Sequence, residues 1–156
     1  MYGWLVFLHL AGLVLFVLCH GVSAFVAYRL RTVRDPGLAI ALLDLSLLAN
    51  RVAYVGLIAL IVGGLGAAAT NNLLGTTWAV ATGVVLVVVL VLMFAIAGSY
   101  YYPLRDRLKP KPTDARPPIE GAELAALLDS RRPDLLGAVG AIGLVVMIGL
   151  MVFKPA

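Results

Sequence analysis

The sequence has little charge and few of the residues that usually carry catalysis. Charged residues make up 13% of its 156 residues, and it holds one cysteine and two histidines. A single cysteine excludes an internal disulfide. The chain also has no phosphate-binding loop, no hydrolase nucleophile motif and no zinc-protease motif. These absences argue against a motif-bearing soluble enzyme, and we expect the chain to have no enzymatic activity of its own.

Apolar residues fill the chain instead. They make up 62% of it, and the mean hydropathy is +1.03, whereas a soluble domain is nearer half apolar. The first apolar run, residues 3–28, contains no charged residue. About 20 residues are enough to span a bilayer, because a helix rises about 1.5 Å per residue. The composition therefore predicts one all-α membrane domain over residues 1–156.

Four such runs predict a polytopic protein with a four-transmembrane-helix up-down bundle. The expected helices cover residues 3–28, 36–69, 76–100 and 133–153. Only helices and closed barrels satisfy the backbone in lipid, which decides for a helix even where the third run is rich in β-branched residues. No proline lies inside these four ranges beyond the first turn, so we expect no proline in a helix interior.

Local residues indicate where the second helix begins and where helices pack closely. Asp35 followed by Pro36 is typical of a helix start, because the carboxylate caps free N–H groups and proline fits the first position. Small residues let transmembrane helices approach each other. Two sets of glycines therefore predict close helix neighbours: Gly63, Gly64 and Gly66 in the second helix, and Gly137, Gly140 and Gly143 in the fourth.

The basic residues predict how the chain lies in its membrane. Eleven of the twelve lysines and arginines are predicted to lie on one side of the membrane, the side that holds the turn after the first helix and the loop 103–132. The exception is Lys154. Such an excess marks the cytoplasmic side. We therefore expect a multi-pass protein of the bacterial cytoplasmic (inner) membrane with both termini outside. Within the loop, residues 105–118 should be extended or loosely ordered, and residues 120–132 should form a short amphipathic helix on the membrane or on the bundle.

The two histidines are the first candidates for function. His9 and His20 are 11 residues apart, so they share a face of the first helix and lie about 16 Å apart along it. An ionisable side chain at membrane depth is a functional candidate. Imidazole is a common axial ligand of haem iron. This pattern favours binding of haem b or another tetrapyrrole, with His9 and His20 as iron ligands.

The second iron ligand has to come from elsewhere. Helix rise places Met147 near the depth of His9 and Met93 near that of His20, and methionine can serve as sixth ligand. Alternatively, a second subunit supplies a histidine, or the iron stays five-coordinate. In the plain alternative, each imidazole bonds a serine, a backbone carbonyl or the cluster of Asn50 and Asp44 inside the bundle. Cys19 points about 100° away from His20 and is expected to pack.

A second candidate group is a charge network at the basic end. Asp44 and Arg51 lie two turns apart on one face of the second helix. They are expected to pair with Arg29 or Arg31 and to fix that helix at the interface. The alternative interpretation is a proton or substrate path that leads to the level of His20.

At this point the chain resembles a known family. The start WLVFLHLAGLVLFVLCHGVSAFVAYRLR, the ending LMVFKP and the four spans resemble uncharacterised predicted integral membrane proteins related to the copper-resistance-D-like group. Some wider relatives with this plan bind haem b through a histidine of the first helix, and the resemblance implies the same here. The four-helix protoporphyrinogen oxidases among them also use a lysine in the third helix. Residues 76–100 contain no lysine, which argues against that activity.

The sequence thus leads to an ordered set of functions. The first is a small inner-membrane protein that binds haem b and acts in electron transfer or as an accessory subunit of a membrane redox complex. The second is a cofactor-free structural subunit that packs against other subunits, or a second copy, through its glycine faces. Transport of copper or a small solute ranks third, because mid-membrane charges and broken helices are missing. Nucleic acid is not an expected partner.

Overall fold

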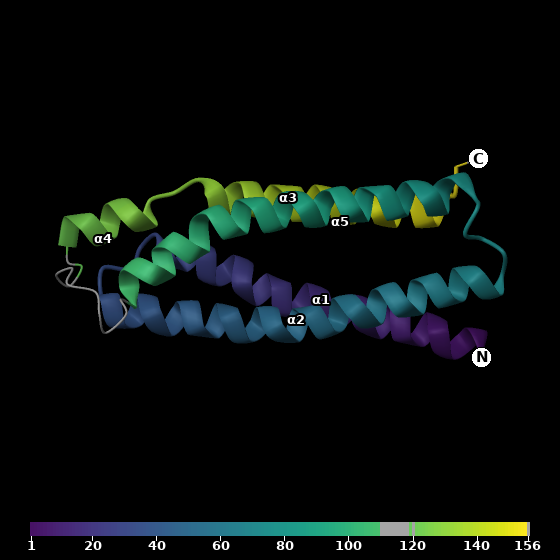
Figure 1. The fold of residues 1–156 in the computed structure, drawn as a ribbon, viewed down its shortest axis with the longest axis horizontal. Helices are drawn as coiled ribbons and strands as arrows, with labels where there is room; N and C mark the ends of the chain where they lie inside the picture. The colour runs from purple at the N-terminus through teal and green to yellow at the C-terminus, as the bar shows by residue number, and fades with distance from the viewer. Residues whose placement is uncertain (110–118, 120, 156) are drawn as a thin grey trace.

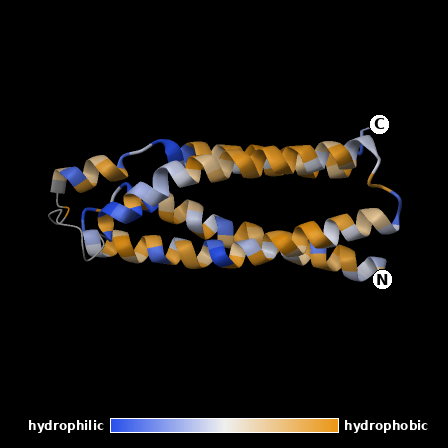
Figure 2. Cartoon of the chain, viewed as in Figure 1, coloured by the Kyte–Doolittle hydropathy of each residue, from blue (hydrophilic) through white to orange (hydrophobic). Residues whose placement is uncertain are grey.

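The computed structural model describes residues 1–109, 119 and 121–155, and these contain helices and no strand. The helices are α1 (Tyr2–Leu30), α2 (Pro36–Thr70), α3 (Thr77–Leu108), α4 (Gly121–Leu128) and α5 (Arg132–Phe153). Four segments are long and apolar enough to cross a membrane: α1, α2, α3 and the segment that ends in α5. Figure 2 shows the apolar residues along the middle of these helices. The expected all-α, four-helix membrane bundle is confirmed.

The long helices form two antiparallel hairpins. α1 packs along α2, and α3 packs along α5, while the two hairpins meet each other at fewer places (Figure 1). Both termini lie at one end of the molecule, and α4 lies at the other. We call the end that holds α4 the basic end, because the described arginines and lysines other than Lys154 lie on that side.

α2 begins where the sequence predicts. The carboxylate of Asp35 accepts hydrogen bonds from the backbone N–H groups of Gly37 at 3.1 Å and Leu38 at 3.0 Å. Pro36 occupies the first helical position, where its missing N–H costs nothing. The cap therefore fixes how the chain enters α2 after the short turn that follows α1.

Glycines hold α1 and α2 close together. A side chain on Gly56 would start 2.7 Å from the backbone nitrogen of Phe16, and one on Gly63 would start 2.5 Å from that of His9. Gly12 of α1 faces the backbone of α2 in the same way. The predicted close neighbour of the second-helix glycines is therefore α1, and these glycines are used inside the molecule.

The glycines of α5 also face inward where they are in contact. A side chain on Gly143 would start 2.5 Å from the Val89 side chain of α3. The position next to it on the same stripe, Gly140, faces Met93 and His20 at ordinary contact distance. The predicted close helix neighbour of this stripe is therefore α3, with part of α1 nearby.

α3 is longer than the sequence predicts. It continues past Tyr100 and through Pro103 to Leu108, so the expectation of no proline inside a helix is wrong. Proline cannot donate to the carbonyl four residues earlier, which is that of Ser99. The guanidinium of Arg132 donates to this carbonyl instead. The helix persists because a side chain replaces the missing donor and because Leu104 and Leu108 after Pro103 are buried.

The most deeply buried side chains lie at the basic end. Leu30, Leu104, Leu124 and Leu128 are each at most 1% exposed, and they belong to one apolar cluster built from α1, α2, α3 and α4. α4 therefore lies on the bundle, which decides between the two placements expected for it. Residues 105–108 are helical where an extended chain was expected, and 110–118 lie outside the described residues.

Candidate functional site

A cavity of about 120 Å³ lies between the two hairpins. We call it the central cavity. All four long helices contribute to its wall, which is mostly apolar and aromatic and contains no Asp, Glu, Lys or Arg. Its polar lining residues are His20, Ser23, Asn50, Tyr54 and Tyr101. An apolar pocket with a few polar groups is the usual form of a ligand site.

His20 is the histidine that lines this cavity. Its ring stacks on Phe16, with ring centres 5.4 Å apart and planes 8° apart. Its Nε2 lies 3.7 Å from the point that a Cβ on Gly140 would occupy. Within the described part of the chain, neither ring nitrogen of His20 has a hydrogen-bond partner. The imidazole is therefore oriented by packing and keeps its polar atoms available.

Met93 of α3 reaches the same place. Its Sδ lies 3.8 Å and its Cε 3.5 Å from the Cβ position of Gly140. The sequence placed Met93 at the depth of His20, and the two side chains converge on one point from different hairpins. Gly140 makes this convergence feasible, because a larger residue would fill the space between them. Whether the pair binds iron stays a prediction.

Ser23 and Asn50 form a polar pair between α1 and α2. The Ser23 hydroxyl contacts the Ser46 carbonyl at 3.2 Å and Oδ1 of Asn50 at 3.0 Å. The plain alternative had expected such residues to bond the imidazole. Ser23 and Asn50 bond each other instead. With its Oδ1 turned to Ser23, Asn50 keeps its amide N–H groups as donors beside the cavity. The signal for Ser23 was its spacing: it lies three residues after His20 on the same face.

His9 has a different environment. Its Nδ1 lies 2.8 Å from the carbonyl oxygen of Leu60, and its ring fits against Gly64, where an added Cβ would start 2.7 Å from Nδ1. This is the backbone-carbonyl bond of the plain alternative. Met147 lies half-buried on α5, while the contacts that hold the His9 ring come from α2. His9 therefore joins two helices and does not line the central cavity.

The described residues offer no closed metal site. No group of three or more His, Cys, Asp or Glu comes together among them. Cys19 is a free, half-buried thiol next to His20 in sequence, and it is not part of the cavity wall. A metal at His20 would therefore have to be held by few protein ligands, as the iron of a tetrapyrrole is.

The charge network pairs other residues than expected. Asp44 binds Arg105 at 2.5 Å and Lys109 at 2.6 Å, so the expected pairing with Arg29 or Arg31 is wrong. The extension of α3 past Pro103 carries these two cations to α2. The hydrogen bond from Lys109, and with it the charge of Arg105, holds the pKa of the Asp44 carboxyl below its ordinary value. Asp44 lies outside the uncharged, membrane-spanning part of α2.

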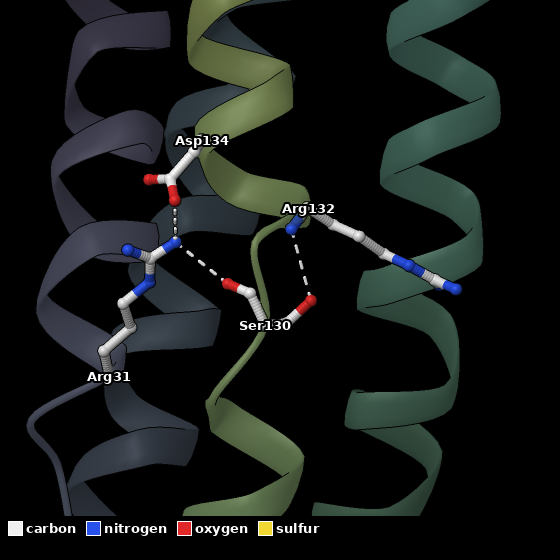
Figure 3. A network of polar contacts seen from close by, with 4 residues as sticks. All are labelled: Arg31, Ser130, Arg132 and Asp134. Carbon is white, nitrogen blue, oxygen red and sulfur yellow. Dashed lines mark hydrogen bonds and ion pairs between the residues drawn. The ribbon is translucent and has the colours of Figure 1, made fainter.

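Arg31 has its own partners, at the start of α5. It binds the carboxylate of Asp134 at 2.6 Å and the carbonyl of Ser130 at 2.9 Å, while the Ser130 hydroxyl accepts from the backbone N–H of Arg132 (Figure 3). The bond to Asp134 raises the pKa of the Arg31 guanidinium. This network ties the α1–α2 hairpin to the α3–α5 hairpin at the basic end. Sequence spacing missed it because the partners lie about a hundred residues apart.

The two other arginines of the expected network stay apart from it. Arg29 donates to the Thr32 hydroxyl at 2.5 Å, within its own turn. Arg51 is exposed on α2, immediately before the uncharged stretch 52–69.

No protein-family model, no curated protein and no solved structure matches the chain.

Proposed function

We propose that this multi-pass membrane protein binds a redox-active ligand in its central cavity and acts in electron transfer or as an accessory subunit of a membrane redox complex. One observation carries the proposal: His20 Nε2 and Met93 Sδ both lie within 4 Å of one point, the Cβ position of Gly140. Two donor side chains that meet in an apolar, uncharged cavity are typical of a site for a bound ligand rather than of helix packing alone.

Haem b is the ligand that the sequence favours, and its fit can be tested on the geometry. The donors fit, because an imidazole and a thioether are an established axial pair. The room does not: a cavity of about 120 Å³ is well below the 300–1,000 Å³ of sites for ligands of even drug size. A macrocycle would extend beyond this space unless the two hairpins moved apart.

The visible spectrum of the purified protein tests the haem. Haem bound at this site gives a Soret band that disappears in His20→Ala and changes position or intensity in Met93→Leu. His9→Ala is the matched control, because His9 bonds the Leu60 carbonyl and does not line the cavity; its spectrum should stay unchanged. A colourless, folded protein from cells with ample haem would exclude this ligand.

The cofactor-free alternative has fewer surfaces to use. Except for Gly137, the glycines that it needed for docking face α1 from α2, or α3 and α1 from α5. A partner subunit would therefore have to meet the outer faces of the helices, whose large apolar side chains suit lipid equally well. The proposal based on the cavity consequently stands first.

The proposal includes a location, the bacterial inner membrane with the basic end in the cytoplasm. The charge bias of the sequence supports it. In a Cys19→Ala background, a membrane-impermeant maleimide added to intact cells should label Lys154→Cys without lysis and Thr32→Cys only after lysis. The opposite pattern would reverse the orientation and leave the cavity proposal unaffected.

A further inference from the structure

We propose that the central cavity binds the head group of a lipid-soluble benzoquinone, whose tail leaves between α2 and α3 into the bilayer. The inference rests on the proposed function and names its ligand class. It starts from the disagreement between the size of the cavity and the size of a tetrapyrrole. The size, polarity and position of the cavity together point to a single neutral ring that enters from the lipid.

The size of the cavity matches one six-membered ring. Its volume is about 120 Å³, and an engineered apolar protein cavity of about 150 Å³ binds benzene. A ring of this size can stack against aromatic walls, which here include Phe16 and Phe94. A ligand with several fused or linked rings exceeds the space.

The polarity of the wall favours a neutral ligand with acceptor oxygens. The wall contains no charged side chain, so an ionic ligand would be desolvated without compensation. The His20 imidazole can donate one N–H, and Asn50 keeps its amide donors because its Oδ1 faces Ser23. Quinone carbonyls are acceptors and have no protons to donate, so they match these two groups.

The position of the cavity explains how a lipid-soluble molecule would enter. Tyr54 of α2 and Phe94 of α3 line the cavity and stack on each other with ring centres 6.1 Å apart. The two residues are 46% and 56% exposed, which in a membrane means contact with lipid. Asn50 precedes the uncharged stretch 52–69. The head group would therefore sit near the interface of the basic end, with its tail at bilayer depth.

Two measurements on the full-length protein in lipid nanodiscs test the inference. The first is organic-solvent extraction of the purified protein, with the benzoquinone quantified by its ultraviolet absorbance. The second is titration with the short-tailed decylubiquinone, followed by the rise in unfolding temperature. We expect co-purified benzoquinone and a saturable rise. His20→Leu and Asn50→Leu should each weaken binding about tenfold, the value of one hydrogen bond.

A cavity-filling variant separates binding from folding. In Gly137→Ala the added Cβ lies on a residue that lines the cavity and has nothing within 4 Å, so the fold should persist while ring binding weakens. Gly149→Ala is the matched control on the same helix, because its Cβ position also has nothing within 4 Å but the residue does not line the cavity; it should bind as the wild type does.

The outcomes distinguish this inference from the proposed function. A Soret band with no benzoquinone overturns the inference and supports the haem. Neither ligand overturns both. Benzoquinone binding that is equal in the wild type, His20→Leu and Gly137→Ala overturns the inference as well, because the ring would then bind outside the central cavity.

Discussion

At the scale of single residues, the glycines on the inward-facing sides of the helices have two different roles. Gly56 faces a helix backbone: its Cβ position is 2.7 Å from the nitrogen of Phe16. Gly140 faces only the ends of side chains, at 3.5 Å and beyond. A backbone cannot move away without moving its helix, whereas a methionine end can shift easily. The first kind of glycine sets a helix distance, and the second kind leaves open space.

The first kind predicts a large effect for a small change. Gly56→Ala should lower the free energy of unfolding by about 1–3 kcal/mol, the usual cost of overpacking, even though alanine is the better helix former. Unfolding of the detergent-solubilised protein by temperature or SDS measures it. Gly149→Ala adds the same methyl group where nothing lies within 4 Å. Equal stability of the two variants would contradict the role of Gly56 as a helix spacer.

The sequence identified both histidines but not their surroundings. Their spacing placed them on one face of the helix, and helix rise placed Met93 at the level of His20, where the structure has it. Which helix each side chain meets depends on how α1 crosses its neighbours, and periodicity along one helix does not contain that angle. His9 therefore meets the α2 backbone, while His20 lies toward α5, although the two share a helix face.

At the scale of elements, the end of α3 is the least predictable feature. A proline that follows an apolar run within about one turn normally marks a helix end. Here α3 continues because Arg132, at the start of α5, donates to the Ser99 carbonyl, and because Leu104 and Leu108 are buried beyond Pro103. Both reasons are long-range, so no local pattern contained them. The cap of α2 at Asp35 needs only adjacent residues, and it was predictable.

This explanation of α3 can be tested with a double-mutant cycle. Arg132→Ala should destabilise the protein by about 1 kcal/mol, because the Ser99 carbonyl loses its donor. Pro103→Ala restores a backbone N–H for that carbonyl, so Arg132→Ala should cost much less in the Pro103→Ala background. Unfolding free energies of the four proteins in one detergent give the coupling. Equal costs in both backgrounds would show that Arg132 does not substitute for the missing backbone donor.

At the scale of the whole molecule, the sequence predicted the number of membrane-crossing segments and their approximate bounds, because lipid demands long apolar helices. The structure adds that the helices pack mainly as α1 with α2 and α3 with α5. That pairing puts the most closely packed contacts inside the hairpins and the central cavity between them. The basic end joins the hairpins through Arg31 and Asp134, and through Asp44 with Arg105 and Lys109.

The two hairpins are joined at the basic end, and the central cavity lies between them. A ligand should therefore enter when α2 and α3 separate locally. Tyr54 and Phe94 stack where these helices line the cavity. In a Cys19→Ala background, Tyr54→Cys with Phe94→Cys joined by a short bismaleimide should therefore slow uptake of decylubiquinone at least tenfold. Each single cysteine variant, treated with the same reagent, controls for the loss of one ring and for the reagent itself. Unchanged uptake in the cross-linked protein would mean that the ligand enters by another route. Uptake slowed only as much as in the single variants would show that the rings matter but the separation of the helices does not.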